Sequence, residues 1–168
     1  MYNQIYSIVD NFVKAAWNDK NFSLLLKNWN GKRGPRRRLT VTQVISLNLL
    51  RFSMHIKDLK AFHRIVKEVD FIANMPNYEN FLKASNKAFP IMALFMQLLL
   101  LQNRLENDSG VHFIDSTPVS TCLNRRIFSH KVTKCFASRG KSTKGWFFGF
   151  KLHGVCSEKG LLEAVIFT

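Results

Sequence analysis

The first part of this chain repeats its hydrophobic positions about every three or four residues, the spacing of one face of an α-helix. A clear case begins near Val41 and continues to Phe52, although its apolar stripe is wider than one face. Just before it, Thr40 and Gln43 have the Thr-x-x-Gln form of a capping box, in which both side chains satisfy backbone N–H groups at a helix start. We therefore predict that a helix begins near Val41.

A second helix is expected from about Ile56 to Val69, with one face that collects Leu59, Phe62, His63 and Val66. Two short helices in sequence are compatible with a DNA-binding helix-turn-helix. They also occur in helical bundles that never contact DNA. The pattern leaves both interpretations open.

Met75-Pro76-Asn77 interrupts the helical pattern, and a short helix is expected over 80–87. Pro90 suits the first turn of a further core helix, whose apolar positions continue to Leu101. The Asn-Asp-Ser-Gly run that ends at Gly110 is the clearest boundary signal. We predict a helical, DNA-binding domain over 1–108 and a second domain over 109–168.

Beyond Gly110 the pattern becomes that of β-strands. Val111 to Asp115 is β-branched and aromatic and is followed by Pro118, which predicts a buried strand with Asp115 near its carboxyl end. Residues 146–153 alternate between two faces, and a turn over 157–160 leads to a third strand over 161–168. The predicted fold is α+β, with helices followed by three antiparallel strands whose sheet is covered on both sides.

Charge indicates the kind of partner. The 168 residues include 25 Lys and Arg against 11 Asp and Glu, a net charge of +14. A hydrophobic fraction of 46% is too high for a disordered basic tail, so the chain should fold. A folded surface of this charge attracts polyanions, and nucleic acid is the leading candidate.

Two stretches without acidic residues, 27–38 and 117–145, concentrate this charge. Glycine and proline in the first predict an exposed basic arm, for which a solvated loop is the alternative. On the predicted second strand, Lys151 and His153 share a face of the sheet. If Asp115 lies on that face, they can contact a phosphate; otherwise they are a solvated pair. The DNA-contact candidates are Lys32, Arg33, Arg36, Arg37, Arg38, Arg125, Arg126, Lys131, Arg139, Lys141, Lys144, Lys151 and His153.

Cysteine usage and hydropathy indicate the compartment. Three cysteines at wide, unequal spacings fit reduced thiols better than disulfides or a structural zinc site. The longest apolar run, 91–101, is shorter than the roughly 20 residues that span a bilayer. The first residues lack the pattern of a secretory signal. We expect a cytoplasmic protein without a membrane partner.

Asp115 is the carboxylate on which catalysis would depend. A charged group in an apolar strand has to pair with a cation or bind one, and no neighbour in sequence pairs with it. A metal site needs further ligands, and only Glu158 and Glu163 follow. Alternatively, Asp115 is a cap that accepts hydrogen bonds from Thr117 or from turn N–H groups.

Five blocks stand out in the second half of the chain: Phe113–Val119, Asn124–Ile127, His130–Val132, Arg139–Thr143 and Gly145–His153. In their order and spacing they resemble bacterial insertion-sequence transposases of the DDE type. Leu39-Thr40 and Tyr78 to Phe81 resemble the amino-terminal half of these proteins more loosely.

By this resemblance, the second domain is the start of a ribonuclease-H-like catalytic domain. Asp115 is then the first acid of a DDE triad and a ligand of Mg²⁺ or Mn²⁺. The second Asp and the Glu of the triad follow the third strand in the family, whereas this sequence ends at Thr168. We therefore expect a truncated domain that neither nicks nor joins DNA alone, with an unpaired strand edge at Val111 to Ile114.

The resemblance implies a role in DNA transposition, in the bacterial cytoplasm near the nucleoid. The implied partners are the terminal inverted repeats of the element and either a further copy of the chain or a full-length transposase. One alternative is a non-enzymatic DNA-binding protein that inhibits transposition. Another is a basic RNA-binding protein.

Overall fold

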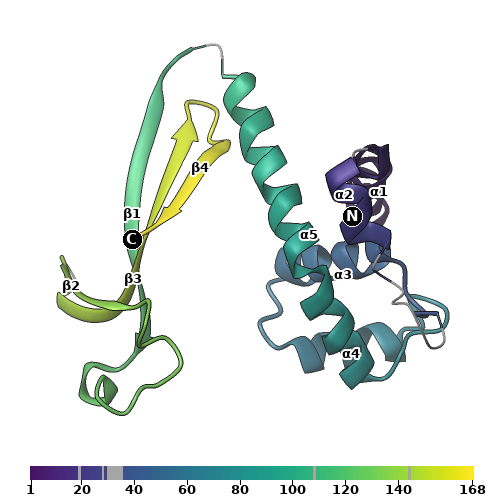
Figure 1. Ribbon diagram of the computed structural model, residues 1–168, viewed down its shortest axis with the longest axis horizontal. Helices are drawn as coiled ribbons and strands as arrows, with labels where there is room; N and C mark the ends of the chain where they lie inside the picture. The colour runs from purple at the N-terminus through teal and green to yellow at the C-terminus, as the bar shows by residue number, and fades with distance from the viewer. Residues whose placement is uncertain (19, 28, 30–35, 108, 144) are drawn as a thin grey trace. The chain divides into compact units, whose positions relative to one another are not determined.

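The computed structural model describes residues 1–18, 20–27, 29, 36–107, 109–143 and 145–168. The chain divides into two compact units, a helical unit over 1–95 and a sheet unit over 96–168. Helices precede strands along the chain (Figure 1), so the predicted α+β order is confirmed.

The helical unit contains α1 (Tyr2–Asn18), α2 (Lys20–Lys27), α3 (Val41–Ser53), α4 (Leu59–Glu68) and the first part of α5 (Tyr78–Leu105). Its core is built on α3, whose Val44, Ile45 and Leu47 are fully buried, together with Phe62 and Phe81. The helices α1 and α2 were not predicted. For α1, the sequence contains one signal: Val9 and Ala16, both buried, are seven residues apart, which is two turns of a helix.

α3 begins with the predicted capping box, whereas α4 begins at Leu59, after a capping residue, Asp58, that was not predicted from the sequence. The Thr40 hydroxyl accepts a hydrogen bond from the Gln43 N–H at 3.1 Å, and the Gln43 side chain accepts one from the Thr40 N–H at 2.9 Å. At α4, the Asp58 carboxylate accepts a bond from the Lys60 N–H at 2.9 Å. The capping box and the helix start near Val41 are confirmed.

Removing the capping hydroxyl should weaken the helical unit. We expect Thr40→Ala to lower its free energy of unfolding by about 1 kcal/mol, because the Gln43 N–H loses its acceptor. Urea denaturation followed by far-ultraviolet circular dichroism measures the loss. Thr40→Ser keeps the hydroxyl and should unfold like the wild type; equal losses in both variants would show that the hydroxyl is not the cause.

One long helix, α5, replaces the two helices predicted around Pro90. The buried positions continue at helical spacing on both sides of the proline, at Phe81, Ala84, Ala88, Ile91 and Phe95. Burial of this stripe outweighs the one backbone hydrogen bond that proline removes. By length and composition α5 could cross a membrane, contrary to the prediction, but core helices of soluble proteins meet the same test.

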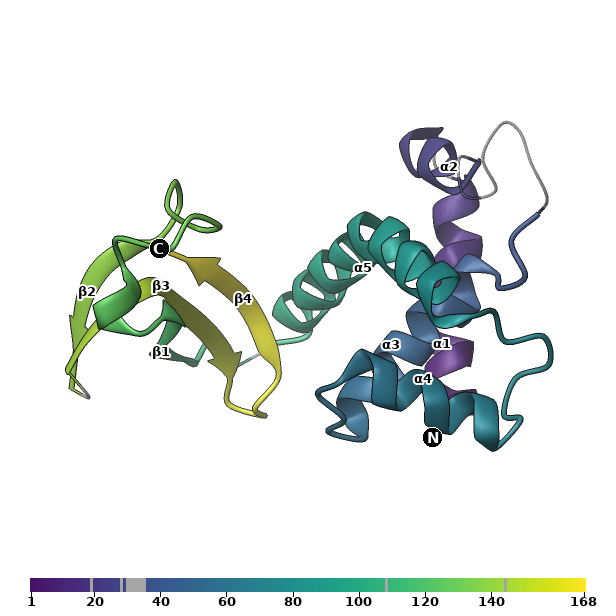
Figure 2. The same ribbon diagram turned by 90° about the horizontal axis from the view of Figure 1, so that it is seen from below.

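The sheet unit contains β1 (His112–Cys122), β2 (Ser138–Ser142), β3 (Gly145–Ser157) and β4 (Leu162–Phe167), all paired antiparallel. β3 is central (Figure 2): β1 pairs along one side, whereas β2 and β4 pair with different segments of β3. The sequence predicted three strands and missed β2. Its sequence, Ser-Arg-Gly-Lys-Ser, has no apolar position, so no pattern marks it.

β1 continues through Pro118, where the sequence predicted its end. The N–H of Lys151 donates to the Thr168 carbonyl at 2.8 Å, and its carbonyl accepts from the Thr168 N–H at 3.0 Å, so both groups point away from β1. Pro118 lies opposite Lys151. In an antiparallel ladder the nitrogen of Pro118 then points to the open edge of β1, where no N–H is required.

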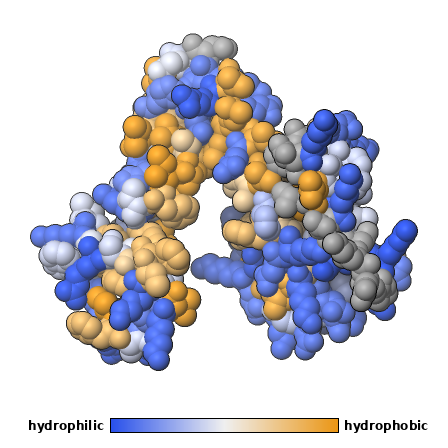
Figure 3. Space-filling model, in the orientation of Figure 1, coloured by the Kyte–Doolittle hydropathy of each residue, from blue (hydrophilic) through white to orange (hydrophobic). Residues whose placement is uncertain are grey.

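The predicted open edge is present, because β1 pairs only with β3 among the described residues. The predicted covering of the sheet is wrong for the described part of the chain. Phe113, Ile114 and Ile166 are 59%, 74% and 57% exposed, and apolar side chains reach the surface of the sheet unit (Figure 3). The strands contain the apolar residues that the pattern identified, but no α-helix is described within residues 106–168 that could cover them.

Candidate nucleic-acid and metal site

Asp115 is the fourth of the 11 residues of β1 and so lies near its beginning, not near its end as predicted, and it is exposed. Its carboxylate accepts a hydrogen bond from the Ser116 N–H at 2.7 Å. Ser116 has the same strand parity as Pro118, so this N–H points to the open edge of β1. Asp115 therefore satisfies an edge donor of its neighbour, which differs from the predicted cap by Thr117 or a turn.

Side chains that lie opposite each other in an antiparallel pair share a face of the sheet. Asp115 is opposite Gly154, and Thr117 is opposite Leu152. We call this side the Asp115 face. Because Gly154 has no side chain, the residue directly opposite Asp115 adds no side chain to this face.

The Asp115 face has no second carboxylate among the described residues of the strands. Glu163 hydrogen-bonds to His112, whose even-numbered position on β1 places it on the opposite face. Glu158 lies in the turn before β4. No group of three or more His, Cys, Asp or Glu that could hold a metal ion occurs within the described residues. The donor set around Asp115 thus does not fit a two-metal site.

Asp115 pairs with Gly154 of β3, so the even-numbered positions of β3 share its face. Lys151 and His153 are odd-numbered and therefore lie on the opposite face. The condition under which they would contact phosphate beside Asp115 is therefore not met. His153 instead places its Nε2 atom 2.9 Å from the Thr168 hydroxyl.

Two other predicted cations share the Asp115 face. Arg139 and Lys141 of β2 lie opposite Phe148 and Trp146 of β3, which have the parity of Gly154. The Lys141 ammonium lies 5.8 Å from the centre of the Trp146 ring, and Trp146 is 62% exposed. This end of the face combines positive charge with an accessible aromatic surface.

The segment between β1 and β2, residues 123–137, is a basic loop that exposes large apolar side chains. It begins with a short 3₁₀-helix, Asn124–Arg126. Phe128, Val132 and Phe136 are 90%, 84% and 78% exposed. Cations alternate with them and no acid is present; these cations are Arg125, Arg126, Lys131 and Lys134. Aromatic side chains interleaved with cations suit contact with bases and phosphates. Lys144 lies outside the described residues.

In the helical unit, Arg36, Arg37 and Arg38 precede α3, whereas Lys32 and Arg33 lie outside the described residues. The Arg37 Nε–H donates to the Trp29 carbonyl at 2.8 Å, and its guanidinium lies 5.0 Å from the Trp29 ring centre. Lys87 donates to the same carbonyl at 2.9 Å. Burial, and then the charge of Arg37, lower the pKa of Lys87.

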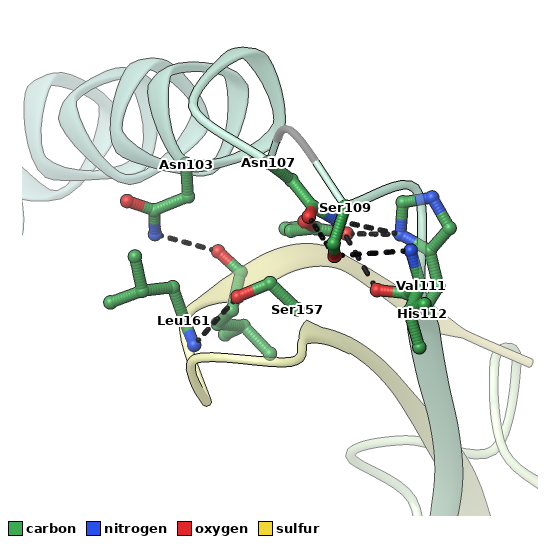
Figure 4. Close-up of polar contacts among 9 residues, drawn as sticks. Asn103, Asn107, Ser109, Val111, His112, Ser157 and Leu161 are labelled. Atoms are coloured by element: carbon green, nitrogen blue, oxygen red, sulfur yellow. Dashed lines mark hydrogen bonds and ion pairs between the residues drawn. The ribbon is translucent and has the colours of Figure 1, made fainter.

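The sequence pattern missed a polar junction between the end of α5 and the sheet (Figure 4). The Asn103 amide donates to the Leu162 carbonyl at 2.8 Å, and Asn107 lies 3.4 Å from His112 Nδ1. His112 Nδ1 is also 2.6 Å from the Glu163 carboxylate, which is buried. The only signal in the sequence was that Glu163 interrupts an otherwise apolar strand. These contacts position the beginning of β1, and with it Asp115.

The comparison with protein families gives one finding. Residues 105–168 match the family described as the transposase DDE domain, a range that covers the end of α5 and all four strands. Neither the search of curated proteins nor the search of solved structures found a match.

Proposed function

We propose that this chain takes part in DNA transposition as part of an insertion-sequence transposase, because residues 105–168 match the transposase DDE domain family. Asp115 is the first acid of the DDE triad in this proposal. The observation that carries it is the position of Asp115 on the first strand of the matched range, exposed and facing Gly154. An acid in that position is accessible to a phosphodiester.

The partner in this proposal is the DNA of the element ends. The basic loop and β2 support it, because Lys141 of β2 lies near the exposed Trp146 ring, the loop cations alternate along the sequence with exposed phenylalanines, and no acid occurs over 117–145. Each phosphate contact releases counterions, so affinity should fall steeply with salt concentration. The cations that would contact phosphates are Arg125, Arg126, Lys131, Arg139 and Lys141. Lys144, which lies outside the described residues, stays a prediction from the sequence.

The family uses a divalent metal ion, Mg²⁺ or Mn²⁺, but the described residues contribute one carboxylate to the Asp115 face. One carboxylate does not position two cations. This observation favours a second candidate function, in which the chain binds DNA without cleaving it and competes with a complete transposase for element ends.

A plasmid assay distinguishes these roles. We expect the wild-type chain to bind DNA containing the terminal inverted repeats in preference to random duplex, and to leave supercoiled plasmid intact with Mg²⁺ or Mn²⁺. Asp115→Ala should bind equally well. Gel mobility shift and agarose electrophoresis measure the two properties.

Each deviation from this pattern has a distinct meaning. Nicking by the wild type that is lost in Asp115→Ala would assign catalysis to this chain and overturn the non-catalytic role. Absence of DNA binding would contradict the proposed function itself. A preference for single-stranded RNA over duplex DNA would identify the chain as an RNA-binding protein instead.

A further inference from the structure

The helical unit contains a cleft of about 630 Å³ between the residues that precede α3 and the beginning of α5. This volume is within the range of roughly 300–1,000 Å³ that small-ligand sites occupy. Its polar lining consists of Arg36, Arg37, Arg38, Asn77, Asn80 and Lys83.

The cleft is strongly positive. Four of its lining residues are cations and none of the described lining residues is acidic. The side chains of Arg36, Arg38 and Lys83 make no hydrogen bond or ion pair with any described residue. Cations held this close repel one another unless an anion lies between them. The guanidinium fork of arginine matches the oxygens of a phosphate group.

Trp29 holds the arginine wall of this cleft in place. Its carbonyl accepts hydrogen bonds from Arg37 and Lys87, and its indole N–H donates to the Leu39 carbonyl at 3.2 Å. Directly after Leu39, the capping box of Thr40 begins α3. The backbone on either side of Arg38 is thus anchored, at Arg37 and at Leu39, before any ligand arrives, so less conformational entropy is lost on binding.

The lining also indicates which part of a nucleotide the cleft accepts. Its apolar residues are Leu39, Pro76 and Ala84, and no aromatic ring is among the described lining residues. Bases are generally held by stacking on aromatic side chains, whereas phosphates need cations and amide donors. The chemistry of the cleft is that of a phosphate site and not of a base pocket.

We propose that this cleft binds the phosphodiester backbone of a nucleic-acid strand, with Lys83 of α5 acting together with Arg36 and Arg38. This inference rests on the proposed DNA partner and adds a second contact surface, in the helical unit. The arginines alone follow from the sequence pattern, but Lys83 and the two asparagines join them only in the folded chain.

The test compares two double variants of the full chain that each remove two positive charges. Arg38→Gln with Lys83→Gln changes the cleft. Lys20→Gln with Lys57→Gln changes exposed cations of the same unit that do not line it. Binding to a fluorescein-labelled DNA duplex is followed by anisotropy over a series of salt concentrations, and circular dichroism confirms that both variants fold.

We expect the cleft variant to lose at least about tenfold in affinity and the control to lose less than about threefold. The slope of log affinity against log salt should fall by about 2 in the cleft variant only, since each phosphate contact contributes about 0.9. Equal losses of DNA affinity in the two variants would show that only the overall charge matters, and would overturn the inference. If the wild type binds DNA and the cleft variant binds with the same affinity, the inference about the cleft is wrong but the proposed function stands. If the wild type does not bind DNA, the proposed function is contradicted as well.

Inorganic phosphate and a mononucleotide serve as separate probes, measured by thermal shift of the wild type and the cleft variant. Weak stabilisation by either that disappears in the cleft variant, together with the loss of DNA affinity, supports a backbone phosphate site. Stabilisation that disappears while DNA affinity is unchanged would identify a small free anion as the ligand and overturn the assignment to nucleic acid.

Discussion

Replacement of Gly149 by alanine should lower the stability of the sheet unit by about 3 kcal/mol, because no space exists for a methyl group there. A Cβ atom at this position would overlap the Val119 carbonyl oxygen. That oxygen belongs to the backbone of β1, next to the register shift between Ser120 and Cys122. The ladder between β1 and β3 would have to open locally to relieve the contact.

Hydrogen exchange of the β1 and β3 amides measures this effect directly. A loss of about 3 kcal/mol corresponds to exchange that is faster by roughly 100-fold in these amides. Gly154→Ala is the matched control, because it lies on the same strand and its Cβ would meet only Leu162 Cδ1 at 3.6 Å. If both variants exchange at the same rate, the close approach of β1 to Gly149 is not what limits stability.

Removal of the His112 side chain should also destabilise the sheet unit, by about 3 kcal/mol. Only 2% of the Glu163 side chain is exposed, one of its carboxylate oxygens has no hydrogen-bond partner among the described residues, and the other is 2.6 Å from His112 Nδ1. His112→Ala would leave a buried carboxylate without its imidazole partner. Burial of an unpaired charge is among the largest single-residue effects on stability.

Urea denaturation of His112→Ala, with hydrogen exchange of the β4 amides as a local readout, tests this expectation. The control is the double variant His112→Ala with Glu163→Gln, which removes the charge along with its partner. It should recover part of the lost stability, since a neutral amide is less costly to bury than a carboxylate. If the double variant is no more stable than His112→Ala, the buried charge is not the source of the loss.

The sequence was informative wherever one residue pattern dominates a segment. The Thr-x-x-Gln box located the start of α3, and the alternation over 146–153 located β3, because both depend on local geometry. Pattern reasoning failed at two prolines that it treated as element boundaries, because it began a helix at Pro90 and ended a strand at Pro118. In both places the surroundings make the missing N–H tolerable: a continuous buried stripe on α5 and an open edge on β1.

The sequence by itself determined that an acid occupies the first strand of the sheet unit and that an acid-free, basic segment follows it. Only the tertiary structure decided which cations share a face with Asp115. Arg139 and Lys141 do, whereas Lys151 and His153 do not. The reason is physical: a strand alternates its side chains between two faces, so a shift of one residue in the pairing with a distant strand would exchange the two sets.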